Sequence, residues 1–155
     1  EGTTGIQALD LLGRKVLMSQ GETLKRFTKL IHKFCQANED SEFTREFVEP
    51  LSALNKEWGD VTMHIGLSAM ENPEEVSAAC VDYLMYSGYI TLGYLWAKAA
   101  VLAKSKEGSA DHAYYASKVK TARFYFQRIL PRTKSHLEMM KAGAKSMMDF
   151  ELDEI

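Results

Sequence analysis

The first seven residues of the chain, Glu1 to Gln7, combine a carboxylate with a turn of small and hydroxylated residues that leads into an apolar helix. A carboxylate in such a position can act as a general base if its surroundings exclude water. Gly2 permits close approach of the backbone to a ligand. The Thr3 hydroxyl and the backbone amides at a helix entrance can donate hydrogen bonds to a carbonyl oxygen or a phosphate. Because the same residue types also cap helices, a purely structural cap is the alternative interpretation.

Two stretches of the sequence resemble a known enzyme family. The letters E-G-T followed by Ile6 and Gln7 resemble the active-site loop of flavin-dependent acyl-CoA dehydrogenases, and residues 8–17 continue that resemblance. Residues 118–126, closing at 130–131, are similar to the last helices of the branch with an extra C-terminal helical domain, typified by 3-methylmercaptopropionyl-CoA dehydrogenase. The resemblance is specific at these two ends and only generally helical between them.

The resemblance implies a role for each residue of the opening loop. Glu1 would remove the α-proton of an acyl-CoA thioester, with Gly2 lying against the substrate, while Thr3 would reach the FAD and Gln7 would line it. A thioester α-proton is weakly acidic, so the carboxylate must be desolvated and must face a stabilised enolate. Gly5 departs from the family pattern, since many members carry a side-chain amide there, and the resemblance does not extend to the hydrogen bond of that amide.

The family implies further partners and a larger protein. An acyl-CoA substrate, an electron-transferring flavoprotein and a homo-oligomer are expected from the resemblance, which covers only the end of such an enzyme. The chain opens on Glu1 with no initiating Met and no leader. We therefore expect it to be the C-terminal part of an FAD-dependent acyl-CoA dehydrogenase that is inactive as an isolated fragment. The runner-up is a helical interaction or oligomerisation module without chemistry.

The composition is that of an ordinary globular domain. The chain has 155 residues, of which 46% are hydrophobic, and its 19 basic and 21 acidic residues leave a net charge of −2. This balance makes nucleic acid and an anionic membrane surface poor candidates as partners. Cys35 and Cys80 are isolated from each other in the sequence, which argues against a disulfide framework and indicates a reducing compartment. We therefore expect a cytoplasmic location, with an organelle matrix as the alternative.

Hydrophobic periodicity predicts helices throughout and no strand of useful length. Residues 6–34 form one helical pattern that is broken at 19–21, and residues 37–41 form a polar connection in which Asp40 or Ser41 can cap the next helix. Because proline starts or kinks a helix, we place the clean part of that next helix after residue 49, from Pro50 to about residue 70.

The second half of the chain predicts two more helices. Asn72, Pro73 and two acids form a typical helix start, and the helix over 73–104 is apolar almost all round, which makes it the expected central helix. Its longest uncharged run is shorter than the ~20 residues that span a bilayer. A last helix is predicted from a cap at Asp111 to about residue 130, with Pro131 kinking or restarting it.

These elements predict an all-α fold, most economically an up-and-down four-helix bundle. We divide the chain into an active-site loop with the end of a preceding helical domain (1–20), a C-terminal helical bundle domain (21–143) and a tail (144–155). The four histidines lack the Glu-x-x-His spacing of bundle metal sites, and we assign no metal ligands. The cysteines and aromatic residues fit core packing, and the basic residues after 117 fit a solvated face.

Overall fold

The computed structural model describes residues 3–150 and 153–154, and these residues form helices joined by short turns, with no strand. The prediction of an all-α fold is confirmed. The elements in chain order are α1 (Thr4–Leu9), the π-helix η1 (Asp10–Leu17), α2 (Glu22–Gln36), α3 (Glu42–Glu71), α4 (Glu74–Ser105), α5 (His112–Phe124), the π-helical turn η2 (Tyr125–Ile129), the 3-10 turn η3 (Leu130–Arg132), α6 (Thr133–Ala142) and α7 (Lys145–Met148).

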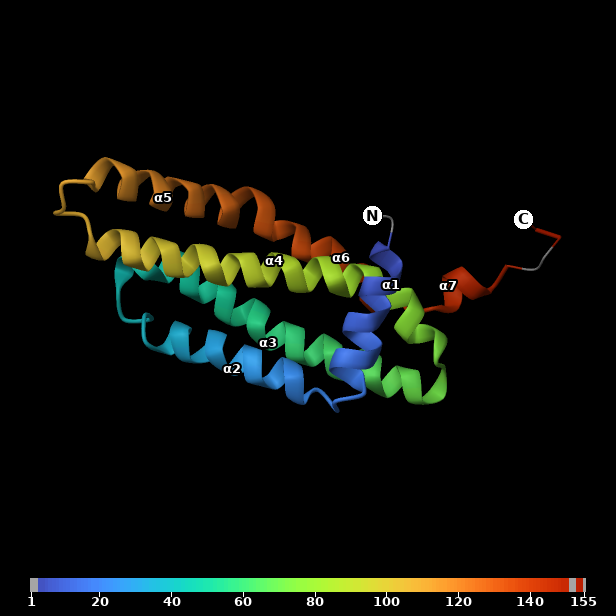
Figure 1. The fold of residues 1–155 in the computed structure, drawn as a ribbon. Helices are drawn as coiled ribbons and strands as arrows, with labels where there is room; N and C mark the ends of the chain where they lie inside the picture. The colour runs from blue at the N-terminus through green and yellow to red at the C-terminus, as the bar shows by residue number, and fades with distance from the viewer. Residues whose placement is uncertain (1–2, 151–152, 155) are drawn as a thin grey trace.

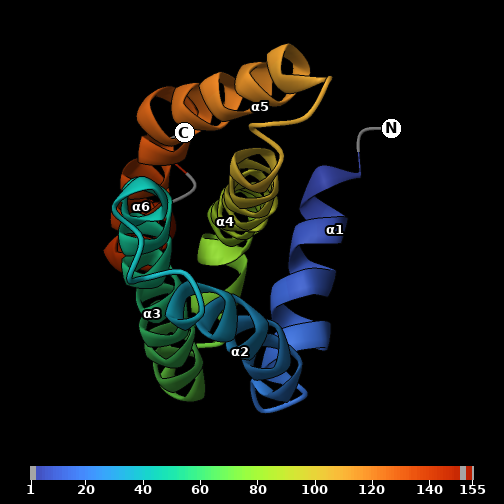
Figure 2. The same ribbon diagram turned by 90° about the vertical axis from the view of Figure 1, so that its left-hand side faces the viewer.

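The long helices lie side by side along one axis, and each reverses the direction of the one before it (Figure 1). α5, η2, η3 and α6 together form the last of these rods, and α1 with η1 lies across one side of the molecule (Figure 1). Viewed along the long axis, α5 and α2 lie at opposite sides of the molecule, with α4 between them (Figure 2). The long helices therefore run alternately up and down, and α1–η1 packs against them as an additional element.

α4 is packed against α1, α3, α5 and α6, and it supplies much of the core. Tyr83, Tyr86 and Ile90 on this helix are completely buried. Between these large side chains, small residues allow neighbouring helices to approach closely, because a Cβ added at Gly93 would lie 3.3 Å from Leu130 Cδ1. The helix that the sequence predicts at the centre, 73–104, corresponds to α4 almost residue for residue.

Two hydrogen bonds from buried tyrosines join α4 to α3. The Tyr83 hydroxyl lies 2.8 Å from Thr62 Oγ1, and the Tyr86 hydroxyl donates to Glu57 Oε2 at 2.8 Å. Burial raises the pKa of Tyr83 to about 12 and also raises the pKa of Tyr86. Both phenols therefore stay protonated at neutral pH, and each places a polar group in the core with a partner, as burial of such groups requires.

Several helix ends follow from local chemistry. The Asn72 side-chain oxygen accepts a hydrogen bond of 3.1 Å from the backbone N–H of Glu74, so the predicted start of α4 is confirmed. The predicted break before α2 is also present, with Gln20 and Gly21 at positive φ values of 53° and 77°. Ser41 lies at the N-cap position of α3, although its side chain makes no capping hydrogen bond.

The prediction that α3 begins cleanly after residue 49 is wrong, since the helix runs unbroken from Glu42 and contains Pro50. Packing of the first two turns explains the difference. Phe47 is completely buried and its ring lies 5.2 Å from that of Phe126, while Thr44 is buried and donates to the Ser41 carbonyl. Pro50 itself is exposed, so the helix can accommodate the missing amide hydrogen on its solvent side.

The last rod is less regular than the single helix predicted from Asp111. α5 ends at Phe124, and the chain passes through η2 and η3 before α6 begins at Thr133. Pro131 therefore marks a restart of the helix, as the sequence predicts. Asp111 lies at the N-cap position of α5, but its side chain makes no capping hydrogen bond. None of the helices in the described ranges is long and apolar enough to cross a bilayer.

Replacing Pro50 with Ala is expected to stabilise the protein. The new backbone N–H can donate to the Glu46 carbonyl and so complete the hydrogen bonds of α3. Alanine also makes the unfolded chain more flexible than proline does, which offsets part of this gain. We expect a net increase of about 1–3 kcal/mol in the free energy of unfolding. Urea unfolding followed by circular dichroism measures this change. The exposed Ser52→Ala variant in the same helix is the control, with an expected gain of no more than about 0.5 kcal/mol. Equal stability of the Pro50→Ala variant and the wild type would contradict this account of α3.

Candidate functional site

Two of the four predicted site residues, Thr3 and Gln7, lie in the described part of the chain, whereas Glu1 and Gly2 lie outside it. Thr3 precedes α1, and its carbonyl accepts a hydrogen bond of 2.9 Å from the Gln7 backbone N–H. Both residues are exposed, and the Thr3 side chain makes no capping hydrogen bond. Residues four positions apart in a helix share a face, so the structure brings these two side chains onto one side of the amino end of α1.

Gly5 lies between these residues on an open part of the surface. A Cβ added at this position would have no atom within 4 Å. Its backbone is helical and needs no glycine. Neither steric contacts nor the backbone conformation therefore require glycine at position 5, and a longer side chain would have room there.

The helix that follows this segment forms one wall of an apolar groove of about 1160 Å³. Leu12 and Val16 anchor the wall in the core and are almost completely buried. α3 forms the opposite wall, and α2 contributes to the floor. The residues that line the groove from these elements include Ile6, Leu9, Gly13, Leu17 and Met18 of the first wall and its end, Gly59, Thr62, Met63, Gly66, Leu67 and Met70 of α3, and Leu24 and Thr28 of α2.

The groove exposes several large hydrophobic side chains. Met70, Met18, Ile6, Met63 and Leu67 have exposed fractions of 83%, 79%, 72%, 68% and 61%. Single exposed hydrophobic residues are normal on protein surfaces, but a contiguous apolar patch marks a binding or assembly surface. The groove is therefore a candidate contact surface next to the predicted active-site segment.

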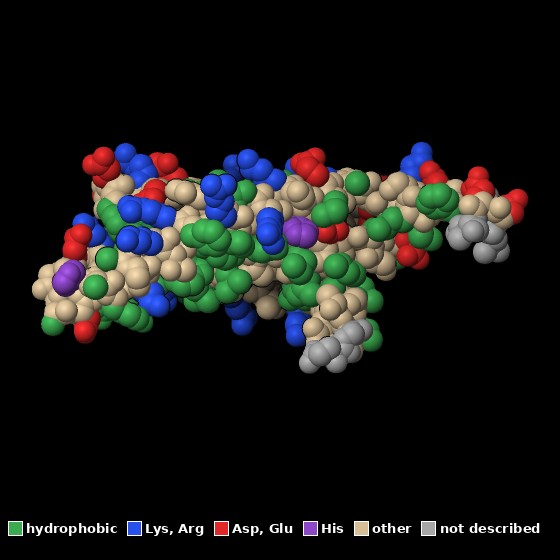
Figure 3. Space-filling model, turned by 90° about the horizontal axis from the view of Figure 1, so that it is seen from above, with side chains coloured by type: hydrophobic (Ala, Val, Ile, Leu, Met, Phe, Trp, Pro, Cys, Tyr) green, Lys and Arg blue, Asp and Glu red, His purple; other side chains and the backbone are tan. Residues whose placement is uncertain are grey.

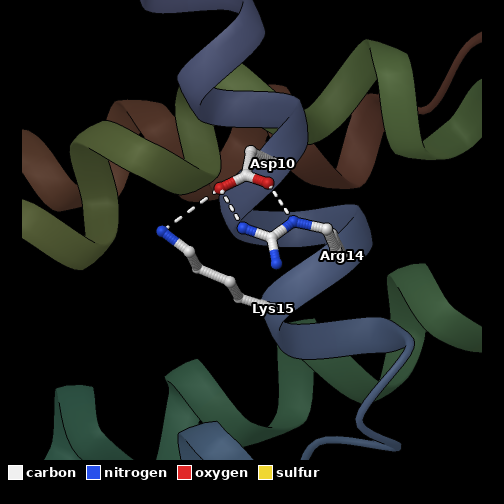
Figure 4. Close-up of polar contacts among 3 residues, drawn as sticks. All are labelled: Asp10, Arg14 and Lys15. Atoms are coloured by element: carbon white, nitrogen blue, oxygen red, sulfur yellow. Dashed lines mark hydrogen bonds and ion pairs between the residues drawn. The ribbon is translucent and has the colours of Figure 1, made fainter.

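Charged residues on η1 flank the groove, with the Asp10 carboxylate held between two cations (Figure 4). Arg14 donates to it through Nε and through Nη2, the second bond being 3.1 Å long, and Lys15 Nζ lies 3.1 Å from Asp10 Oδ2. The hydrogen bonds from Arg14 and then Lys15 lower the pKa of Asp10 to about 2. The carboxylate is therefore ionised at neutral pH and fully engaged, which suits it to holding η1 in shape rather than to accepting a proton.

η1 is π-helical over its whole length, an uncommon conformation that occurs frequently at functional sites. It leads from the predicted active-site segment to the turn at Gly21, where the chain enters α2. The sequence places Arg14 four residues after Asp10, a spacing that predicts their ion pair, but nothing in the pattern distinguishes a π-helix from an α-helix here.

The other candidate groups have structural partners. His136 Nδ1 lies 2.8 Å from Asp82 Oδ1, and its ring stacks on Tyr89. Cys35 and Cys80 are buried free thiols, and burial raises the pKa of Cys35 to about 11. Within the described ranges, no group of three or more His, Cys, Asp or Glu side chains is placed to hold a metal ion.

Comparison with known proteins identifies the family. A family model described as "Acetyl-CoA dehydrogenase C-terminal like" matches residues 27–151. The chain belongs to this family. The resemblance to acyl-CoA dehydrogenases that the sequence carries is thereby confirmed, and residues 1–26, which include α1, η1 and the turn at Gly21, lie before the matched region.

Two curated proteins are similar to most of this chain. Butyryl-CoA dehydrogenase of Syntrophomonas wolfei subsp. wolfei is 29% identical over 154 residues, covering 96% of this chain and 25% of the relative. 3-methylmercaptopropionyl-CoA dehydrogenase of Ruegeria pomeroyi is 31% identical over 134 residues, covering 84% of this chain and 22% of the relative. The chain thus spans about a quarter of the length of the curated relatives it matches.

The groove was not predicted from the sequence of this family member, and the predicted site in the opening segment stays a prediction. The groove is formed by residues from five elements, α1, η1, α2, α3 and α4, which come together only in the folded chain. The spacing of Met63, Leu67 and Met70 could have indicated an apolar face, since these residues lie at three and four positions from one another. They lie off the face of Trp58, Val61 and Ile65, which fills the core.

The Asp10→Asn variant is expected to be less stable than the wild type at neutral pH. Asp10 has a lowered pKa in the folded state, so its contribution is fully present above its ordinary value of 3.8 and disappears as the pH falls through about 2. The difference in melting temperature between the variant and the wild type should therefore close over this acid range. Melting curves at a series of pH values measure it, with Asp60→Asn on α3 as the control. A difference that persists unchanged at the acid end would contradict the role of the ionised carboxylate.

Proposed function

We propose that this chain is the C-terminal part of an FAD-dependent acyl-CoA dehydrogenase, which introduces a double bond between the α and β carbons of an acyl-CoA thioester. The observation that carries the proposal is the similarity to two acyl-CoA dehydrogenases over 96% and 84% of this chain but only about a quarter of their length. The isolated chain should be inactive, because most of a dehydrogenase of that length lies outside it. Residues 1–20 then belong to the active-site loop and the end of the flavoprotein helical domain, residues 21–143 to the appended bundle and residues 144–155 to a tail.

Glu1 is the proposed catalytic base. In this role its carboxylate takes the α-proton, and Gly2 leaves room for the acyl thioester beside the backbone. The proton is weakly acidic, so the base must work where water is excluded and where donors stabilise the enolate. Those donors must come partly from the rest of the polypeptide.

Thr3 and Gln7 are the residues proposed to hold FAD. Their exposed side chains on one side of α1, with open space at Gly5 between them, fit a flat ligand lying against the amino end of this helix. The chemistry that FAD supplies when bound is acceptance of the β-hydrogen as hydride. The residues of this chain bind and orient it, and Glu1 holds the proton.

The groove along α1, α2 and α3 is proposed to be covered by the preceding part of the same polypeptide. Its lining is mainly apolar, and one of its walls is α1–η1, which precedes the region matched by the family model. An apolar helical face from the upstream domain would remove its exposed methionine and leucine side chains from water. This packing would also fix α1 relative to the rest of the protein.

The remaining partners follow from the same family. We propose an acyl-CoA substrate, an electron-transferring flavoprotein as the redox partner, a homo-oligomeric enzyme and a cytoplasmic location. The alternative is a helical interaction or oligomerisation module without chemistry, which the apolar groove would also suit. The two proposals differ in whether Glu1 takes part in a reaction.

Replacing Glu1 with Gln in the full-length protein should abolish the loss of flavin absorbance that an acyl-CoA substrate causes, with FAD still bound. Gln has nearly the same shape but cannot accept the proton. Absorbance spectroscopy under anaerobic conditions measures both the bound flavin and its reduction. Glu22→Gln, at the start of α2, is the control and should behave as the wild type. Normal reduction in the Glu1 variant would favour the module without chemistry, and a full-length protein that binds no flavin would reject the dehydrogenase assignment.

The proposed covering of the groove is tested with two matched substitutions. Leu67 in the groove and Leu102 on α4 have similar exposed fractions of 61% and 57%. If the groove is covered, Leu67→Asp should lower the free energy of unfolding of the full-length protein by about 2–4 kcal/mol, because it buries an unpaired charge. Leu102→Asp should have a small effect, and denaturant unfolding measures both. Equal effects of the two substitutions would mean that the groove stays open.

A further inference from the structure

The charges of this chain are strongly segregated along the sequence. Residues 112–142 contain seven Lys and Arg residues but only one acidic residue, Glu138, which gives a formal excess of six positive charges. The whole chain has a net charge of −2, so the rest of it is strongly acidic. The near-neutral net charge of the whole chain, which makes an anionic membrane surface a poor candidate partner, conceals this asymmetry.

The basic residues occupy the rod formed by α5, η2, η3 and α6. Figure 3 shows Lys and Arg side chains gathered along this face of the molecule, with hydrophobic side chains between them. We define the basic strip as the exposed cations Lys120, Arg128, Arg132, Lys134 and Lys141. At a rise of 1.5 Å per residue, the strip is roughly 30 Å long.

In the part of the chain that the structure describes, the cations of the strip are not neutralised by carboxylates. Arg123, next to the strip, forms an ion pair with Glu46 on α3 at 2.8 Å, and Lys118 lies over the ring of Tyr114 at 4.6 Å from its centroid. Among residues 3–150 and 153–154, the five cations of the strip form no ion pair with a carboxylate. Their charge is therefore available to an external anion.

Exposed apolar side chains lie among these cations. Tyr114 and Phe124 each have an exposed fraction of 58%, and that of Met139 is 48%. Phe124 lies four residues after Lys120 and four residues before Arg128, so the three side chains follow one another along the same side of the helical rod. Cations with interspersed aromatic side chains are typical of helices that lie in the interface of an anionic membrane.

The shape of the strip separates the possible anionic partners. A small anion needs a concave site, but the hollow of about 380 Å³ near this face reaches only Lys120 of the strip. A protein partner is anchored by a compact cluster of buried side chains, whereas Tyr114, Phe124 and Met139 are spread singly along the rod. The anionic headgroups of a phospholipid surface do not have to lie at fixed positions opposite the cations. Such a surface can therefore contact the long, convex basic strip along its whole length.

We propose that the basic strip binds the protein peripherally to anionic phospholipid membranes, with α5 and α6 lying on the surface and Phe124 entering the headgroup region. The strip lies away from the groove, since α5 and α2 are on opposite sides of the molecule (Figure 2). The protein can therefore use both surfaces at the same time, and lipid binding is independent of the dehydrogenase chemistry.

The test is sedimentation of the full-length protein with vesicles of phosphatidylcholine alone and of phosphatidylcholine mixed with phosphatidylglycerol. The protein should bind only the mixed vesicles and should dissociate at high ionic strength, because salt screens exposed charges. Loss of a single cation near an anionic membrane weakens binding about fivefold, so the Lys120→Gln/Arg128→Gln variant should bind about 25-fold more weakly. The Phe124→Ser variant should also bind more weakly but keep the dependence on salt.

The matched control removes two exposed cations from α2, on the opposite side of the molecule, as Lys29→Gln/Lys33→Gln. This variant should bind mixed vesicles as the wild type does, and circular dichroism verifies that all variants are folded. Equal weakening in the control and in the strip variant would overturn the proposal, as would the absence of binding to mixed vesicles. Binding to soluble polyglutamate but not to vesicles would also overturn it and would assign the strip to an acidic protein.

Discussion

The close packing of α4 against its neighbours is the interaction on which the rest of the structure depends. Completely buried Tyr83, Tyr86 and Ile90 alternate along this helix with small residues that let other helices approach. Since the helix is enclosed by α1, α3, α5 and α6, each of those helices is left with one outward side. Hydrophobic burial around α4 thus decides which residues of the surrounding helices face solvent or a partner.

The two outer surfaces differ in chemistry because they lie on different neighbours of α4. On the side of α1, α2 and α3 the outward residues form an apolar groove, and on the side of α5 and α6 they form a basic strip. α3 has a part in both regions, since it forms one wall of the groove and its Glu46 pairs with Arg123 beside the strip. The helices therefore present two surfaces of unlike chemistry on opposite sides of α4.

Much of this arrangement is predictable from the sequence because it is local. The cap at Asn72, the turn at Gly21 and the apolar pattern of α4 each depend on a few neighbouring residues, and the structure contains all three. The course of α3 through Pro50 is not predictable in this way, because the contact of Phe47 with Phe126 joins positions almost eighty residues apart in the sequence. The groove has the same origin, since its walls come together only in the folded chain. The opening segment was singled out by its resemblance to a known family, and its chemistry stays a prediction because Glu1 and Gly2 lie outside the described residues.

The methionines of the groove would make the proposed covering sensitive to oxidants. Met18, Met63 and Met70 expose most of their side chains along this surface. Oxidation of a thioether to a sulfoxide converts a flexible apolar side chain into a polar one, and methionine sulfoxide reductases reverse the change. A groove that is covered only intermittently would collect sulfoxides while it is open, and each would oppose the return of the apolar covering. The fraction of methionine sulfoxide at these three residues would then increase with the time that the groove is exposed to solvent in the cell.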